Sequence, residues 1–228
     1  MKRLWKENKT VLMLALLDFV LVTGTGFYFG CKIWQIIPLW VSVVVMFLQT
    51  RVNRYAFILG GCNSVWYAVV NVTQGLYATA AYTILFSTSL QFISFWNWNR
   101  RAYKNSTYLR VLSGKYRLLL GIGFAVTWGF MFAVFAAFGS PYMVLDNTVS
   151  VLGICCSLLL LFSFVEGYAV NLVCGLCTIS MYLQLILDRP DQMPYLVAAV
   201  YSTICVAISM RNAYRLYKEQ NRIGTCSN

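Results

Sequence analysis

The chain has 228 residues, of which 60% are hydrophobic and only 11% are charged, and its formal net charge is +11. A soluble domain of this length would lack the polar side chains needed to cover its surface, so the composition excludes a soluble fold and favours a membrane protein. Basic loops facing anionic lipid account for the positive charge, and we therefore expect no nucleic-acid partner but contact with membrane lipid.

Eight apolar stretches follow one another along the chain, each close to the ~20 residues that cross ~30 Å of hydrocarbon. The first comes after a basic start, as in a signal peptide, but it stays apolar to Phe29 without a small-residue cleavage site, which favours a retained span. We therefore predict an all-α integral membrane protein. Its eight spans are Val11–Gly30, Ile33–Thr50, Tyr55–Leu76, Tyr77–Trp98, Leu118–Phe138, Thr148–Val165, Gly167–Leu187 and Tyr195–Met210.

Lys and Arg are shared very unevenly between the two sides of these spans. Of the 18 basic residues, only Lys32 and Arg189 fall on one side, and all the others fall in the N-terminus, the second and fourth connections and the C-terminus. Because short basic connections stay in the cytoplasm, we predict a multi-pass protein of the bacterial cell membrane with both termini cytoplasmic.

This topology contains a repeat, since spans two to four take the same orientations as spans six to eight. A fifth span between them gives a 3+1+3 arrangement of two parallel repeats, as in some transporters, with span one outside the core. The predicted parts are an N-terminal span (1–31), a first three-helix repeat (33–98), a basic cytoplasmic loop (99–117), a linker span (118–138), a second repeat (148–210) and a basic cytoplasmic tail (211–228).

Uncharged polar and aromatic side chains concentrate in the second and third helices of each repeat. Their backbone groups are already bonded, so amides facing lipid would only add cost and should point inward. In the fourth span, for example, Ser87, Gln91, Ser94 and Trp98 form one stripe at ~100° per residue. Interhelical hydrogen bonding is one explanation. The other is a nucleoside-like solute, because aromatic faces stack on planar rings and amides read their edges. The candidate substrate-binding residues are Asn63, Trp66, Tyr67, Asn71, Gln91, Ser94, Trp98, Glu166, Tyr168, Asn171, Tyr182 and Tyr201.

Ionisable and metal-binding side chains are scarce inside the spans. Asp18 is the only acid predicted at depth, and it lies outside the repeats, so we expect transport without ion coupling. The chain has no His, and most of its eight Cys lie within spans. Cys174-Gly-Leu-Cys177 has redox spacing but is more typical of helix packing. We expect no metal and no cofactor.

Several of these residues resemble the PnuC-type family of bacterial vitamin transporters, best known for nicotinamide riboside. The second half of that family carries a Glu, followed by Trp two residues after it, Trp five residues after it, Asn nine residues after it and Tyr sixteen residues after it. This chain has Glu166, Tyr168, Asn171, Gly175 and Tyr182 at those offsets. The first half resembles the family through Gly75-Leu76-Tyr77 and through Gln91-x-x-Ser94-x-x-x-Trp98, where the family usually has Gln-x-x-Gly-x-x-x-Trp. The resemblance extends over about Leu39 to Tyr217.

The resemblance implies a facilitator that moves a nucleoside-like vitamin or precursor down its gradient, with a cytoplasmic kinase trapping the product. Nicotinamide riboside, another nucleoside or a thiamine-like ring compound would fit. An intramembrane enzyme would need a metal or an acid/base pair, for which the sequence offers no His and no close carboxylate pair. A non-transporting membrane partner is the other alternative, since Gly26-Phe-Tyr-Phe-Gly30 offers a packing face that would equally suit a homo-oligomer.

Overall fold

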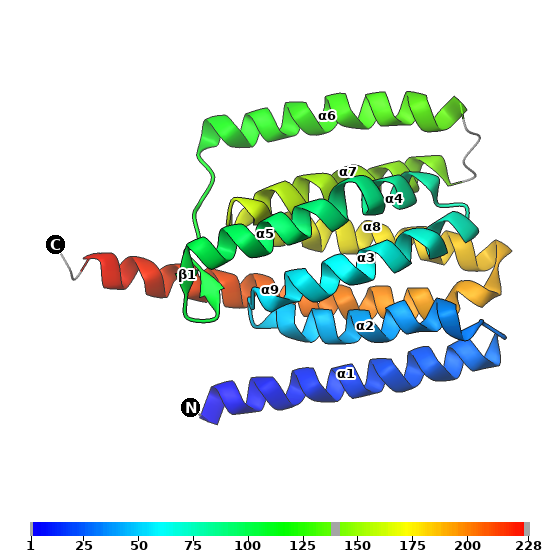
Figure 1. Ribbon diagram of the computed structural model, residues 1–228, viewed down its shortest axis with the longest axis horizontal. Coiled ribbons are helices and arrows are strands. Elements are labelled where there is room, and N and C mark those ends of the chain that lie inside the picture. Colours follow the sequence, from blue (N-terminus) through cyan, green and yellow to red (C-terminus); the bar gives the residue numbers. More distant parts are fainter. Residues whose placement is uncertain (1, 138–141, 226–228) are drawn as a thin grey trace.

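The computed structural model describes residues 2–137 and 142–225, with side chains described for residues 9–136 and 142–222. Most of these residues are helical (Figure 1). The long helices are α1 (Lys2–Tyr28), α2 (Ile33–Thr50), α3 (Tyr55–Thr73), α5 (Thr88–Arg100), α6 (Gly114–Ala137), α7 (Met143–Leu161), α8 (Glu166–Asp188) and α9 (Met193–Thr225). The short elements are α4 (Tyr77–Tyr82), a π-helical segment (Thr83–Ser87), a 3₁₀ turn (Pro190–Gln192) and the hairpin of β1 (Ala102–Tyr103) and β2 (Ser106–Thr107).

Seven helices of the described chain are long and apolar enough to cross a membrane: α1, α2, α3, α6, α7, α8 and α9. The count of eight predicted spans is not confirmed. The predicted span Tyr77–Trp98 is instead divided into α4, the π-helical segment and α5, which follow one another without a break up to Arg100. The end of the predicted linker span, Phe138, lies outside the described residues, and the sixth predicted span begins earlier than expected, at Met143.

The helices run alternately up and down beside one another (Figure 1). Both termini lie at one end of the molecule, together with the connections 51–54, 101–113 and 162–165, and we call this the basic end. The connections 29–32, 74–76 and 189–192 lie at the opposite end. The basic connections of the sequence are therefore gathered on one side of the fold.

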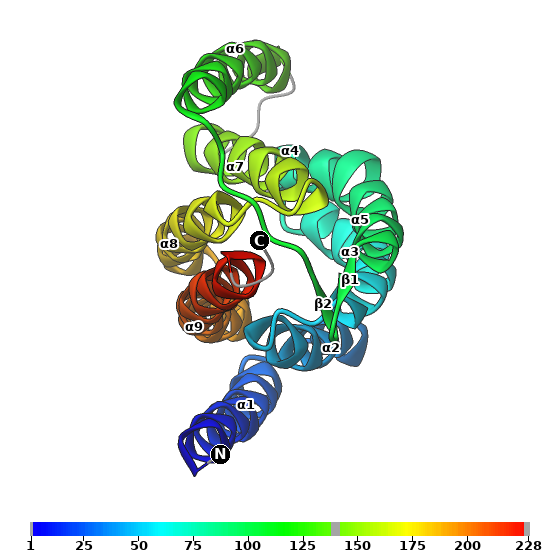
Figure 2. The same ribbon diagram turned by 90° about the vertical axis from the view of Figure 1, so that its left-hand side faces the viewer.

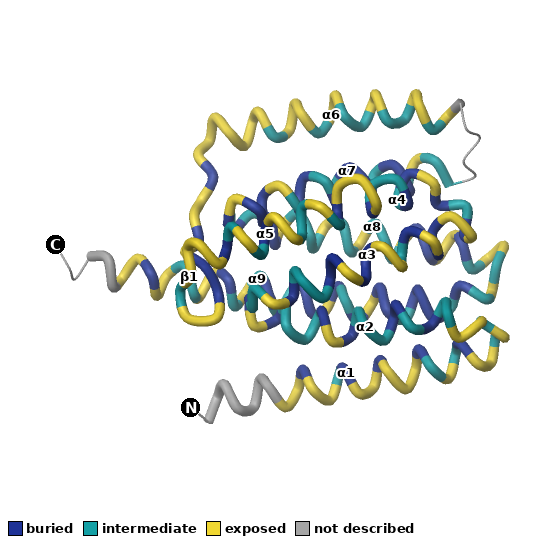
Figure 3. Tube along the Cα trace, viewed as in Figure 1, coloured by how far each residue is buried: buried dark blue, intermediate teal, exposed yellow. Residues whose placement is uncertain are grey.

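A ring of helices forms the centre of the molecule when it is viewed along the helices (Figure 2). α2, α3, the 77–100 segment, α7, α8 and α9 pack in that order, and the ring is completed where α9 packs against α2. α1 packs outside the ring against α2 and α9, and α6 packs outside it against α7. Within the apolar window of α6 no residue is buried (Figure 3), as expected of a helix that faces lipid.

A buried carboxylate fixes the start of the 77–100 segment on α7. Asp146, fully buried in the first turn of α7, accepts hydrogen bonds from the backbone N–H groups of Ala78 (3.0 Å) and Thr79 (2.9 Å) and from the Thr79 hydroxyl (2.5 Å). The first N–H groups of a helix have no partner within the helix, so they are free to donate to Asp146. A negative charge at this position is also attracted to the positive end of the helix dipole. Asp146 falls between the predicted spans that end at Phe138 and begin at Thr148, but the structure buries it, so Asp18 is not the only buried acid.

Candidate functional site

A cavity of about 250 Å³ lies inside the ring, bounded by residues of α2, α3, α5, α7 and α8 together with Tyr82 and Ser87. Among the described residues, none of those that line it is charged. Its polar lining consists of hydroxyls and amides, from Ser42, Gln49, Asn63, Ser64, Tyr67, Tyr82, Ser87, Gln91, Ser94, Ser157 and Asn171. Such a lining can accept and donate hydrogen bonds without offering a counter-ion.

Five of the candidate substrate-binding residues line this cavity: Asn63, Tyr67, Gln91, Ser94 and Asn171. They come from α3, α5 and α8, so the ring brings together residues of both halves of the chain. Asn63 Nδ2 donates to the Pro38 carbonyl (2.9 Å) and to Ser42 Oγ (3.0 Å), which ties α3 to α2 beside the cavity. Contact of these residues with a substrate stays a prediction.

Trp66 does not line the cavity, and its indole forms a hydrogen bond with the backbone of α2. Its side chain is 43% exposed, and its indole Nε1 donates to the Trp34 carbonyl (2.8 Å). Pro38, four residues after Trp34, has no N–H group and leaves that carbonyl without its usual partner within α2. An unpaired carbonyl is costly in a membrane. The Trp66 indole therefore completes the hydrogen bonding of α2.

Trp98 and Tyr168 lie beyond the cavity, toward the basic end. Trp98 is 1% exposed, donates from Nε1 to the Leu160 carbonyl (2.7 Å), and meets the Phe57 ring edge-on at 4.7 Å between centroids. Tyr168 is buried in the same apolar cluster. Because Phe57 and Leu160 line the cavity, Trp98 supports its wall from behind.

The remaining candidates do not line the cavity either. Tyr182 stacks on Tyr195 (5.9 Å between centroids, 22° between planes) in an apolar cluster near the opposite end, against which Tyr67 packs. Tyr201 belongs to a small cluster with Ala15 of α1. Asn71 is buried in α3 but does not line the cavity.

Glu166 lies at the basic end and holds the chain that crosses it. Its Oε1 accepts hydrogen bonds from the Leu112 backbone (3.0 Å) and from Arg117 Nη2 (2.9 Å). Glu166 therefore fixes the entry to α6 and does not line the cavity.

The connection 101–112 passes across the basic end of the ring (Figure 2). Gln220 of α9 accepts from the Leu109 N–H and donates to the Thr107 carbonyl (2.9 Å each), while Arg110 pairs with the 163–165 turn. Nearby, Lys104 forms an ion pair with Glu219 at 2.7 Å, and this hydrogen bond raises the pKa of the Lys104 ammonium above its usual value. The predicted basic loop is thus folded against the ring.

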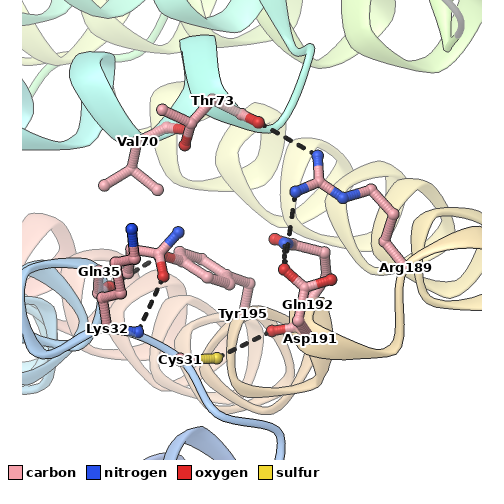
Figure 4. A network of polar contacts seen from close by, with 9 residues as sticks. All are labelled: Cys31, Lys32, Gln35, Val70, Thr73, Arg189, Asp191, Gln192 and Tyr195. Carbon is pink, nitrogen blue, oxygen red and sulfur yellow. Dashed lines mark hydrogen bonds and ion pairs between the residues drawn. The ribbon is translucent and has the colours of Figure 1, made fainter.

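A second polar network ties the connections at the opposite end (Figure 4). Arg189 Nη1 donates to the Thr73 carbonyl (3.1 Å), and Arg189 Nη2 lies 3.6 Å from Asp191 Oδ2. The Cys31 thiol donates to the Asp191 carbonyl (3.1 Å), and Gln192 donates to its carboxylate (2.6 Å). These contacts join the α1–α2, α3–α4 and α8–α9 connections.

Asp18 is buried on α1, and neither of its carboxylate oxygens has a hydrogen-bond partner among the described residues. α1 packs outside the ring, and Asp18 does not line the cavity.

Sequence reasoning missed several hydroxyls of the cavity, among them Ser42, Ser64, Tyr82 and Ser157. Ser87 belongs to the stripe of the fourth span but is not among the predicted binding residues. Its position one turn before Gln91 was the signal available, and Gln91 Nε2 does donate to Ser87 Oγ (2.8 Å).

Comparison with solved structures shows the same fold in a protein described as the vitamin B3 transporter PnuC. The two structures have a TM-score of 0.80, the alignment covers 94% of this chain and 97% of the other, and the sequences are 17% identical. Comparison with curated proteins finds no match.

A model of the family described as nicotinamide mononucleotide transporters matches residues 32–215. This confirms the resemblance inferred from the Gln91 and Glu166 motifs. Together with seven apolar helices, it makes the protein a multi-pass membrane transporter and not an enzyme. Because the match extends over more than half of the sequence, the chain belongs to the nicotinamide mononucleotide transporter family.

Proposed function

We propose that the protein facilitates the diffusion of a nucleoside-like vitamin or precursor, nicotinamide riboside or a related nucleoside, across the bacterial cell membrane into the cytoplasm. The observation that carries the proposal is the cavity inside the ring, lined by uncharged amides, hydroxyls and aromatic rings. Its volume of about 250 Å³ is small for a ligand pocket and suits a single nucleoside or a compound of similar size.

The uncharged lining favours an unphosphorylated solute over a nucleotide. A phosphate that leaves water needs Arg, Lys or free backbone N–H groups to replace its hydration, and an unpaired charge costs several kcal/mol. The family is named after a mononucleotide, but the cavity of this chain offers the phosphate no basic side chain among the described residues. A cytoplasmic kinase would then retain the nucleoside after entry by adding that charge.

Transport without ion coupling follows from the same lining. Coupling to protons or sodium normally requires a carboxylate or an unwound carbonyl cluster at the site. Asp18 lies outside the ring, Asp146 caps the 77–100 segment, and Glu166 pairs with Arg117 at the basic end. None of these acids lines the cavity.

Uptake into proteoliposomes tests this function. With labelled nicotinamide riboside, uridine, thiamine and nicotinamide mononucleotide, we expect saturable uptake of at least one unphosphorylated compound, no uptake of the mononucleotide, and an initial rate that is unchanged when proton or sodium gradients are collapsed. Empty liposomes give the background rate. Accumulation above the external concentration that an uncoupler abolishes would contradict facilitated diffusion and make Asp18 or Glu166 a coupling residue.

The proposed membrane arrangement has both termini in the cytoplasm, with 33–98 and 148–210 as parallel repeats joined by the 118–138 linker. It rests on the gathering of the basic connections at one end of the fold. The outer helices α1 and α6 would be free to contact lipid or another copy of the chain.

Reporter fusions test this arrangement. Fusions within the 101–113 connection should report the cytoplasm, and fusions at 189–192 should report the outside. The distribution of basic residues is the reason, since such connections resist translocation. A fusion after residue 222 serves as the control for the C-terminus. An external 101–113 connection would refute the orientation.

A further inference from the structure

The Gln91 carboxamide belongs to a closed hydrogen-bond network with two serines at the wall of the cavity. Gln91 Nε2 lies 2.9 Å from Ser64 Oγ and 2.8 Å from Ser87 Oγ. The two serine oxygens are 3.1 Å apart, and Ser64 Oγ also donates to the Gly60 carbonyl at 2.9 Å. All of these side chains line the cavity, and Ser64 and Ser87 are both buried.

The direction of these hydrogen bonds follows from counting hydrogens. Each serine hydroxyl has one hydrogen to donate. Ser64 uses its hydrogen on the Gly60 carbonyl, so Ser87 must be the donor in the contact between the two serines. Neither hydroxyl has a hydrogen left for Gln91, and both must accept from it. The carboxamide is therefore held with its NH₂ group toward the serines, and both N–H bonds are used.

The carbonyl oxygen of Gln91 is left on the other side, next to Gly60. A Cβ atom at Gly60 would overlap Gln91 Oε1 and would lie 3.3 Å from Cδ, so the absence of a side chain at this position makes room for the carboxamide. Within the described part of the chain, no donor forms a hydrogen bond with Oε1. The network thus presents one unpaired acceptor at the cavity.

The π-helical segment brings Tyr82 to the same cavity as Ser87. Tyr82 and Ser87 are five residues apart and would point about 140° apart in an α-helix. A π-helical turn bonds residue i to i+5 and brings such residues near one face. Both side chains do line the cavity, where the Tyr82 hydroxyl lies 3.1 Å from Ser157 Oγ and its ring fills the space beside Gly153.

We propose that Gly60, Ser64 and Ser87 are positioning residues that hold Gln91 Oε1 as an acceptor for a hydroxyl or N–H donor of the transported solute. This inference rests on the proposed function and narrows its substrate class, because a solute without a donor at that point would leave the acceptor unpaired. Leaving a buried polar group unpaired weakens binding by about 10- to 100-fold.

The test compares donor-deleted analogues across variants. Nicotinamide riboside and uridine are measured beside their 2′-deoxy, 3′-deoxy and 5′-deoxy analogues and, for uridine, the N3-methyl analogue, by binding to the purified protein and by uptake. For whichever parent compound is transported, we expect one analogue to bind the unmodified protein about 10- to 100-fold more weakly. In Gln91→Met, which keeps the length of the side chain and removes the acceptor, parent and analogue should bind equally weakly.

The positioning residues are tested by the same comparison. The Ser64→Ala/Ser87→Ala double variant and Gly60→Ala should both discriminate less between parent and analogue, although Gln91 is still present. The single variant Ser87→Thr keeps the hydroxyl and should discriminate as the unmodified protein does. Ser180→Ala, an exposed serine on α8 whose hydroxyl bonds only within its helix, is the matched control. Melting temperatures identify variants that fail to fold. If the serine and glycine variants fail to fold, the comparison with Gln91→Met still tests the proposal.

The outcomes separate the two proposals. If neither parent compound binds or is transported by the unmodified protein, the proposed function fails for nucleosides. If a parent is transported but Gln91→Met discriminates between parent and analogue as the unmodified protein does, the role of Gln91 is refuted while the transport function stands. Full discrimination in the folded serine double variant refutes the positioning role.

Discussion

Replacing Trp98 by alanine is expected to lower the free energy of unfolding by about 3–5 kcal/mol, the range for deletion of a buried aromatic side chain. The indole is 1% exposed, packs on Phe57 and donates to the Leu160 carbonyl, so its loss leaves both a void and an unpaired acceptor. Thermal unfolding in detergent measures the effect.

A matched control for this change lies two residues away. Trp96 is 63% exposed, and its replacement by alanine removes the same side chain with little packing, so the melting temperature should hardly change. A Trp98→Ala protein with normal stability and selectively weakened substrate binding would contradict the expectation. Trp98 would then be a substrate-stacking residue, as the stripe in the sequence predicted.

Asp146→Ala should destabilise the protein by about 3 kcal/mol, because three donors of the 77–79 turn lose their acceptor inside the fold. The 77–100 segment carries Gln91 and Ser94, so uptake should fall together with stability. Unfolding in detergent and uptake are both measured.

Asp188→Asn is the comparison for this second change. Asp188 is another carboxylate at the same end of the molecule, but its hydrogen bond with the Tyr142 hydroxyl is exposed. Exposed polar pairs contribute about 1 kcal/mol or less, so this variant should be nearly as stable as the unmodified protein. Equal stability of the Asp146 and Asp188 variants would show that the Asp146 contacts do not hold the segment in place.

The sequence predicted the helices well where apolar length and charge decide them. The bounds predicted for α2, Ile33–Thr50, agree with the structure. The division of the 77–100 segment was not predicted, because a π-helical turn depends on what its side chains meet. The capping role of Asp146 depends likewise on the approach of α4 to α7.

The sequence identified which face of each helix points into the ring, but not at which height along the helix the cavity lies. A helical stripe identifies one face, and on that face Gln91 and Ser94 line the cavity while Trp98, one turn further on, lies behind its wall. Tyr182 is displaced in the same way toward the opposite end. The periodicity of a sequence contains no information on where along the helix axis a cavity begins or ends.

The serines of the cavity were harder to predict. A serine in a helix commonly bonds to its own backbone, as Ser64 does with Gly60, so its presence in a span indicates little by itself. Only the fold shows that Ser64 and Ser87, from different helices, share Gln91 as a partner.

The contact between Trp66 and Trp34 has an evolutionary consequence. Pro38 removes a donor from α2, and an indole from the neighbouring helix replaces it. Neither change is favourable alone: proline without the indole leaves a bare carbonyl facing lipid, and the indole without proline finds that carbonyl already occupied. Selection therefore acts on the two positions as a pair, and sequences that diverge from this one should lose or keep Pro38 and Trp66 together.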